Sequence, residues 1–199
     1  MAAGASTRLG QPKQLVRLRG RSLIERSVRL AQEVSPNRVV VVIGADHLRV
    51  RRHLYAKSLR PRIVRSPNWR QGMSTSLKDG LQALPASAHG LLVLLCDQPA
   101  IAACDIGRLV RAWRQRPAAP TAAAFSGRIG APAIFPRRFF RNLQSLAGDK
   151  GARDLLRSNA QTSTVQMPAA AIDVDTPADR RALSRLSLSR SRWRNSPSR

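Results

Sequence analysis

The sequence has few cysteines and no long apolar run. Cys96 and Cys104 are the two cysteines in 199 residues, too few for a disulfide framework and without a histidine or cysteine cluster at zinc-ligand spacing. We interpret both as small core residues. No run of about 18 apolar residues could span a bilayer, and no basic segment followed by an apolar stretch marks a secretory signal. These absences predict a cytoplasmic protein that does not bind a membrane.

Acidic and aromatic residues are also scarce. The chain has 11 acidic against 35 basic residues, a formal net charge of +24, and 4% aromatics. So large a charge is typical of proteins that meet polyanions. Nearly all of it is arginine scattered along the chain, and few aromatics are available to stack bases. We therefore expect weak, charge-driven association with polyanions and no specific recognition of nucleic acid.

Helical and extended patterns alternate along the chain. Apolar residues at helical spacing predict helices near 22–34, 73–84, 105–115 and 152–158, and β-branched or apolar runs predict strands at 38–43, 62–66, 91–95, 121–125 and 131–135. This alternation is typical of an α/β domain with a mainly parallel sheet. We expect one domain over 1–187, followed by a basic, disordered tail over 188–199 that is rich in serine and arginine.

The opening loop, AAGASTRLGQPK, combines small residues with two cations. Ala2, Ala3 and Gly4 would let backbone N–H groups approach a phosphate, while Arg8 and Lys13 add positive charge. The loop is neither a Walker A sequence nor a G-x-G-x-x-G, so an ordinary surface turn is an equal alternative.

A carboxylate follows the apolar strand LLVLL. Asp97 comes directly after this strand and Cys96, where ligands bind in open α/β sheets. A carboxylate there can hold Mg²⁺ together with substrate phosphates and water. A turn or helix-capping aspartate is the equal alternative on position alone.

Six ordered stretches resemble the MobA-like nucleotidyltransferase family, and in particular molybdenum cofactor cytidylyltransferases. They are AAGASTRLGQPKQL, NWRQGMSTSLKDGL, CDQP, GRIGAPAIF, GDKGARDLL and DVDTPAD. The resemblance implies a Rossmann-like nucleotidyltransferase fold with helices on both faces of the sheet. It also implies Mg²⁺-dependent transfer of a nucleotidyl group, with release of pyrophosphate, to the phosphate of a molybdopterin-type acceptor. The Ala-Ala-Gly loop favours CTP over GTP.

The resemblance also implies roles for particular residues. Lys13 would contact the triphosphate, Arg8 would help to hold the departing pyrophosphate, and Ala2, Ala3 and Gly4 would lie against the nucleotide. Asp97 would carry the metal.

A second carboxylate near the metal would be Asp173 or, preferred here, Asp175. The same stretch is also a good helix start, with Thr176 as cap and Pro177 at the first helical position.

Two further segments would border the substrates. Asn68 and Ser74 belong to a segment that borders the nucleotide base in the family, although such residues equally cap a helix beginning near Met73. Asp149 and Arg153 would face the phosphate-bearing acceptor, with ion pairing at a solvated helix start as the alternative.

The family's first strand is missing from this sequence, because the chain begins where that strand should end. We expect either a start upstream of Met1, which we favour, or a truncated copy.

Two other functions remain open: nucleotidyl transfer to another phosphorylated acceptor such as a sugar phosphate, or a basic accessory protein that delivers cofactor. A molybdoenzyme or a chaperone is the expected protein partner.

Overall fold

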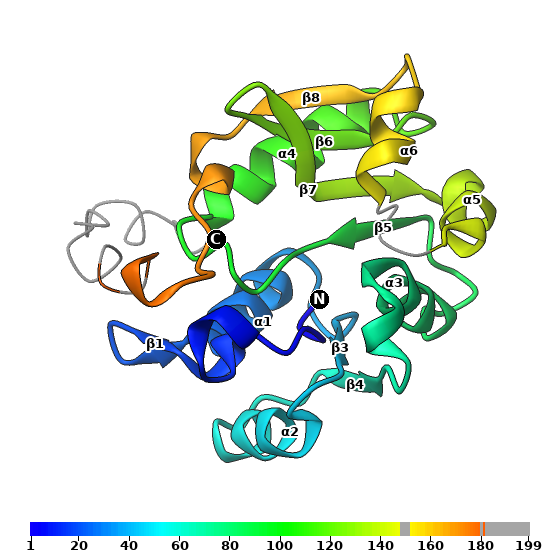
Figure 1. The fold of residues 1–199 in the computed structure, drawn as a ribbon. Coiled ribbons are helices and arrows are strands. Elements are labelled where there is room, and N and C mark those ends of the chain that lie inside the picture. Colours follow the sequence, from blue (N-terminus) through cyan, green and yellow to red (C-terminus); the bar gives the residue numbers. More distant parts are fainter. Residues whose placement is uncertain (148–151, 180, 182–199) are drawn as a thin grey trace, which may run out of the picture.

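The computed structural model describes residues 1–147, 152–179 and 181, and its helices and strands alternate as the sequence predicts (Figure 1). The tail expected over 188–199 lies outside the described residues. The α-helices are α1 (Leu23–Val34), α2 (His47–Ala56), α3 (Met73–Gln82), α4 (Ala103–Gln115), α5 (Phe140–Ser145) and α6 (Ala152–Ser158). The strands are β1 (Arg17–Leu18), β2 (Arg21–Ser22), β3 (Val40–Ile43), β4 (Arg62–Arg65), β5 (Gly90–Val93), β6 (Thr121–Phe125), β7 (Arg128–Pro136) and β8 (Ser163–Gln166). Short 3₁₀ turns are η1 (Thr7–Leu9), η2 (Lys13–Leu15), η3 (Trp69–Gln71), η4 (Arg137–Phe139) and η5 (Pro168–Ala171).

The strands form an α/β fold whose sheet is mixed. Strand β3 pairs in parallel with β4, and a four-stranded sheet has the order β5-β7-β6-β8. Within it, β7 runs antiparallel to both β5 and β6, whereas β6 and β8 are parallel. Strands β5, β6 and β8 therefore share one direction, and β7 is the reversed strand between them. The predicted α/β class is confirmed, and β7 adds an antiparallel element that the sequence pattern does not reveal.

Helices cover both faces of the strands, as the resemblance implied. Val41 and Ile43 of β3 pack in one cluster with residues of α1 and α2. Val42, between these two residues, faces α3, because a Cβ added at Gly80 of α3 would lie 2.7 Å from Cγ2 of Val42. In β7, Ile134 packs with α4 residues, and Phe135 packs with Leu143 of α5 and Leu156 of α6. The alternation of side chains along each strand thus supplies two apolar faces.

Local signals explain the element boundaries that matter for the site. Ser22 caps α1, since its Oγ accepts a hydrogen bond from Glu25 N at 3.2 Å. The hairpin that joins β1 to β2 turns at Arg19 and Gly20, which both have positive φ, the geometry of the favoured two-residue turns. Leu18 of this hairpin and Leu23 of α1 pack in one cluster with Leu9 of the opening loop.

Two observations bear on the predictions from composition. Among the described residues, no helix combines the length and apolar character needed to cross a bilayer. Cys96 is buried, as expected, and burial raises the pKa of its thiol to about 12. Cys104 is exposed, so its prediction as a core residue was wrong. It lies in the first turn of α4, whose buried face is formed by Ile106 and Leu109.

Candidate active site

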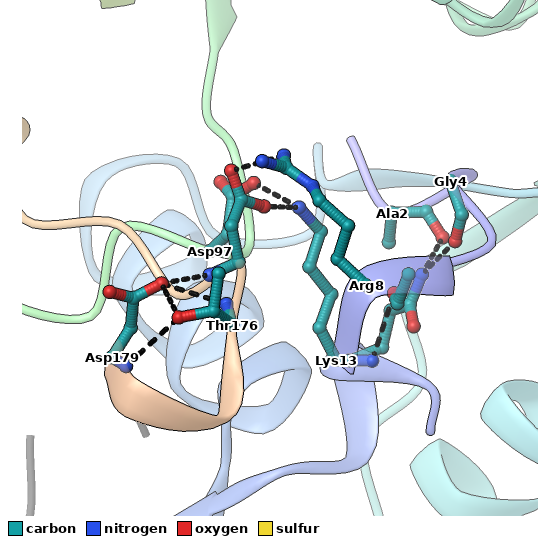
Figure 2. A network of polar contacts seen from close by, with 10 residues as sticks. Ala2, Gly4, Arg8, Lys13, Asp97, Thr176 and Asp179 are labelled. Atoms are coloured by element: carbon teal, nitrogen blue, oxygen red, sulfur yellow. Dashed lines mark hydrogen bonds and ion pairs between the residues drawn. The ribbon is translucent and has the colours of Figure 1, made fainter. Parts of the chain in front are cut away.

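Lys13 lies between two carboxylates that are far from it in the sequence (Figure 2). Its Nζ donates to Asp97 Oδ2 at 2.6 Å and to Asp175 Oδ1 at 2.9 Å. The side chains of Lys13 and Asp97 are 17% and 18% exposed, whereas that of Asp175 is 32% exposed. One end of the group is therefore sheltered by the protein and the other is open to solvent.

Arg8 extends the group toward the solvent. Its Nη2 lies 3.1 Å from Asp175 Oδ2, and its side chain is 70% exposed. The two cations and the two carboxylates thus form one continuous chain of ion pairs. An exposed guanidinium at its outer end is free to turn toward a dianionic ligand.

The opening loop is held by Gln14, a residue that the sequence analysis did not select. Gln14 is 1% exposed, and its Nε2 donates to the carbonyls of Ala2 and Gly4, both at 2.9 Å. Ser6 Oγ accepts from the backbone N of Lys13 at 3.0 Å. These bonds fix the loop on both sides of Arg8. The turn η2 reads Lys-Gln-Leu, so no local sequence pattern marked Gln14 for burial.

The segment around Val174 brings the second carboxylate to the first. Val174 is fully buried in a cluster with Leu9 and Leu23, and its N donates to Asp97 O at 3.0 Å. The chain near residue 174 therefore contacts the opening loop and the segment after β5 at once. This packing places Asp175 beside Lys13.

The DTPAD stretch forms the predicted helix start and also places a carboxylate beside the two cations. Asp179 Oδ2 accepts from the backbone N of Thr176 at 2.7 Å and from that of Asp175 at 3.0 Å. The N of Asp179 donates to Thr176 Oγ1 at 3.2 Å, which is a capping arrangement at a helix start. The cap uses Thr176 and Asp179 (Figure 2), and the Asp175 carboxylate pairs instead with Lys13 and Arg8.

The electrostatics of the group follow from its partial burial. Desolvation by itself lowers the pKa of Lys13, but the charges and hydrogen bonds of Asp97 and Asp175 outweigh it, so the pKa is raised. Lys13 is therefore charged throughout the physiological range. Asp97 Oδ1 is buried, and no hydrogen-bond partner for it is found among the described residues, which is costly for a carboxylate oxygen.

This unpartnered oxygen bears on whether the site suits a metal. Asp97 and Asp175 offer oxygen ligands within about 3 Å of the same Nζ, and Mg²⁺ prefers one or two carboxylates completed by phosphate oxygens and water. No group of three or more His, Cys, Asp or Glu residues suited to a metal is found in the part of the chain that the structure describes. The residues present fit a cation that a phosphate substrate helps to hold.

The small residues of the opening loop differ from the prediction in one respect. The N–H of Ala2 is not available to a phosphate, because it donates to Val42 O at 2.9 Å. Ala2 and Ala3 are buried, and Ala3 O lies so close to Gly44 that a Cβ there would be 2.6 Å away. Gly4 is exposed, and a Cβ added to it would meet nothing within 4 Å. The open part of the loop therefore begins at Gly4.

Two of the remaining predicted residues line a common cavity, and two do not. Ser74 and Arg153 line one cavity of about 360 Å³, whose wall also includes Leu95, two residues before Asp97. Asn68 is exposed and is not among the residues that line this cavity. The cap of α3 is Gly72, without a side-chain hydrogen bond, so the predicted helix-capping alternative for Asn68 and Ser74 was wrong. Asp149 lies outside the described residues.

Comparison with known proteins assigns the family. Residues 1–165 match the MobA-like NTP transferase domain. The chain belongs to this family. The matched residues of this MobA-like domain include Lys13 and Asp97 and end before Asp175. The family that the sequence motifs suggested is thereby confirmed.

Relatives of this MobA-like chain carry different names. Nicotine blue oxidoreductase of Paenarthrobacter nicotinovorans is 35% identical over 167 residues, which are 79% of this chain and 79% of that protein. Purine catabolism protein PucB of Bacillus subtilis (strain 168) is 29% identical over 207 residues and covers 92% of this chain and 95% of its own. The crystal structure of Rv0371c from Mycobacterium tuberculosis H37Rv has a TM-score of 0.77 and 26% identity, and covers 92% of this chain and 95% of that one. The similarity therefore extends over nearly the whole domain.

Proposed function

We propose that the protein is a Mg²⁺-dependent nucleotidyltransferase that moves CMP from CTP to the phosphate of a molybdopterin-type acceptor. An acceptor phosphate oxygen forms a bond to the α-phosphorus of CTP. The bond from that phosphorus to the bridging oxygen of the β-phosphate breaks, and pyrophosphate leaves with its electron pair. Membership of the MobA-like NTP transferase family supports the reaction class.

The observation that carries the proposal is the position of Lys13 between Asp97 and Asp175, with Arg8 at the outer end. Nucleotidyl transfer needs little covalent work from the protein, because aligning the reacting oxygens and neutralising charge supply most of the catalysis. A permanently charged ammonium and an exposed guanidinium are suited to a triphosphate and to the departing pyrophosphate. Ion pairs with the two carboxylates hold the ammonium in place.

A bound Mg²⁺ would be held by Asp97 and Asp175 and would supply charge neutralisation on the phosphate oxygens. The chain's own residues do the remaining work. Lys13 orients the triphosphate, Arg8 contacts the leaving group, and Gln14 keeps the loop that joins them in one conformation. Ala3 and Gly4 would pass beside the nucleotide.

The cavity lined by Ser74 and Arg153 offers the place for an organic group of the substrates. Its wall is largely apolar, with residues such as Met73, Leu77 and Phe135, and its volume is about 360 Å³. We propose that the Ser74 hydroxyl contacts the nucleotide and that the Arg153 guanidinium, with Asp149, contacts the acceptor. Asn68 would contact the base from the exposed turn before α3.

The first experiment measures pyrophosphate release with CTP, GTP, ATP or UTP, with and without Mg²⁺, using molybdopterin or glucose 1-phosphate as acceptor. The product is identified by mass spectrometry. We expect release that requires Mg²⁺ and molybdopterin and is faster with CTP than with GTP. Turnover with glucose 1-phosphate alone would replace the proposed acceptor by a sugar phosphate.

A matched pair of variants decides between catalysis and simple polyanion binding. Lys13→Met removes the central ammonium, while Lys57→Met removes the same charge at the end of α2. We expect turnover to fall about 10²-fold in the first variant and to stay unchanged in the second. If no combination releases pyrophosphate and both variants bind polyphosphate equally, the accessory-protein hypothesis takes the place of the enzyme. A redox reaction, as the name of the Paenarthrobacter relative suggests for that protein, would also proceed without pyrophosphate.

A further inference from the structure

The residue after Asp97 is a glutamine whose side chain lies inside the protein. Gln98 is 9% exposed. Its Nε2 donates to Ala170 O at 2.9 Å and to Ala131 O at 3.1 Å. Its Oε1 is buried, and no hydrogen-bond partner for it is found in the part of the chain that the structure describes. The side chain therefore supplies two donors to the main chain of η5 and β7 and leaves its own acceptor unpaired.

The first of these bonds holds the segment that carries Asp175. Ala170 belongs to η5 (Pro168–Ala171), which precedes Asp175 by a few residues. At the other end of this segment, Val174 N donates to Asp97 O at 3.0 Å. In Figure 1 the orange segment after β8 runs beside the green segment that follows β5. The segment 170–174 is thus tied at both ends to two consecutive residues, and Asp175 follows directly.

This tie matters because Asp97 and Asp175 carry the same charge. Both accept a hydrogen bond from the one Nζ of Lys13, at 2.6 and 2.9 Å, so the two carboxylates lie close together. Like charges at such a distance repel each other, and more strongly where the protein excludes water. In the proposed reaction Lys13 also contacts the triphosphate. A neutral amide bound to the main chain holds the Asp175 segment in place without depending on that ammonium.

The second bond of Gln98 reaches the wall of the cavity that Ser74 and Arg153 line. Ala131 of β7 is a further lining residue of this cavity of about 360 Å³. The same amide therefore joins the main chain of the cavity wall to the segment that carries Asp175. A reaction between groups held at two places requires those places to keep a fixed relation, and a misplacement of about 1 Å can lower a rate about 10²-fold.

We propose that Gln98 is a positioning residue, whose amide fixes the Asp175 carboxylate beside that of Asp97 and fixes both relative to the cavity. It acts through the carbonyls of Ala170 and Ala131. This role rests on the proposed function, in which Asp97 and Asp175 hold the metal. A glutamine that served folding alone would change the stability of the protein, but neither its metal affinity nor its turnover per folded molecule.

The experiment compares Gln98→Met, which keeps the length of the side chain but removes both donors, with a variant that only loses stability. Val50→Ala is that reference, because Val50 is fully buried in α2 and has no part in the site. Asp175→Asn and the double variant Gln98→Met, Asp175→Asn complete a cycle. The readouts are the urea midpoint, the affinity for Mn²⁺ by titration calorimetry, and kcat and KM for CTP.

We expect Gln98→Met to lower the affinity for Mn²⁺ about tenfold and kcat about tenfold or more. The KM for CTP should change less, because Lys13 and Arg8 remain in place to bind the triphosphate. Val50→Ala should lower the urea midpoint alone. In the Asp175→Asn background, Gln98→Met should lower Mn²⁺ affinity by less than about twofold, because a residue that acts through Asp175 then has nothing to position.

Two results would overturn the role of Gln98 and leave the proposed function intact. One is a Gln98→Met variant that matches Val50→Ala in Mn²⁺ affinity and kcat. The other is a further tenfold loss of Mn²⁺ affinity in the Asp175→Asn background, because Gln98 would then act independently of Asp175.

The opposite pattern separates the proposed function from this inference. If the parent releases no pyrophosphate while Mn²⁺ affinity follows the expected cycle, the proposed function is wrong and Gln98 still positions Asp175. If the parent does not bind Mn²⁺, both are wrong. Should Gln98→Met not fold, Gln98→Asn replaces it with the same expectations, because its shorter side chain cannot reach both carbonyls. Failure of both variants to fold would assign Gln98 to folding and contradict the proposal.

Discussion

The segment from Met1 to Gln14 connects two regions of opposite character. At its later end, Lys13 and Arg8 meet Asp97 and Asp175, and the charged atoms are matched across distances of 2.6 to 3.1 Å. At its beginning, Met1 lines an apolar cavity of about 450 Å³ that also has residues of β3 and β5 in its wall. One region is rich in polar partners and the other has few.

The two regions therefore differ in their contribution to ligand binding and to folding. Ion pairs at the partly exposed end contribute little to folding, yet they hold cations where a phosphate ligand can use them. The apolar cavity between β3 and β5 has few polar side chains that could take part in a reaction. A group that filled it would bury apolar surface and pair backbone groups, and both effects favour folding.

Asp97→Asn should break the charged region with the greatest effect on activity. The substitution keeps the size of the side chain but removes a carboxylate that pairs with Lys13 and is proposed to hold the metal. We expect kcat/KM to fall by about 10²- to 10³-fold and Mn²⁺ affinity, measured by titration calorimetry, to fall about tenfold or more.

The matched control for that variant is Asp46→Asn at the start of α2. It removes the same charge away from the site and should leave both quantities unchanged. Undiminished Mn²⁺ binding in Asp97→Asn would argue against Asp97 as a metal ligand, whatever happens to turnover.

Gln14→Leu should separate the two regions by releasing the loop between them. It leaves the carbonyls of Ala2 and Gly4 without their side-chain donor, and each buried unpaired group costs about 1 to 3 kcal/mol. We expect a loss of about 2 kcal/mol or more in the free energy of unfolding, measured in urea. Gln71→Leu, at an exposed position in η3, is the control and should change it by less than about 0.5 kcal/mol. A loss no larger than that of the control would show that Gln14 does not hold the loop.

The buried amino group of Met1 gives the apolar region a pH dependence. Burial lowers its pKa below the ordinary value of 8.0, although the charge of Asp97 acts in the opposite direction. Because the unfolded chain holds this proton at pH values where the folded chain has lost it, stability rises with pH between the lowered pKa and 8.0. The slope contributes at most about 1.4 kcal/mol per pH unit.

Urea midpoints measured from pH 6 to pH 9 test this slope. Acetylation of the amino terminus removes its charge, so the contribution of the amino group to the slope should vanish. An unchanged slope in the acetylated chain would assign the pH dependence to other groups.

Arg8→Ala should have the smallest effect on folding among these variants. The guanidinium is 70% exposed, so its pair with Asp175 contributes less than about 1 kcal/mol to stability. The KM for the nucleotide should rise up to about tenfold, less so at high salt because ions screen an exposed charge. Arg51→Ala on the exposed side of α2 is the control. If the KM at low salt equals that of the control, Arg8 does not contribute to nucleotide binding.

Much of the fold was predictable because its signals are local. The strand at 121–125 and the helix at 152–158 have the bounds that the pattern predicted, since apolar runs and helical spacing act within a few residues. Ser22, at the first position of the predicted helix, is the residue that caps α1. The antiparallel course of β7 was not predictable, because its sequence gives the strand but not its direction.

The candidate site was predictable in its residues but not in their contacts. Lys13, Asp97 and Asp175 could be selected by resemblance, yet nothing in the sequence relates Lys13 to a residue 162 positions away. Gln14 was missed because a glutamine beside a lysine has no sequence signal for burial. The Ala2 N–H was assigned to a phosphate, whereas strand pairing with Val42 takes it.

The sequence by itself determined the type and order of the elements, the excess of arginine, and the family, because these depend on local pattern and on motifs read in order. Only the tertiary structure decided that Val174 packs beside Leu9 and so brings Asp175 to Lys13. The tertiary structure also places β3 and β5 on opposite sides of an apolar cavity. The physical reason is that packing and strand pairing join residues by their distance in space, which the distance along the chain does not fix.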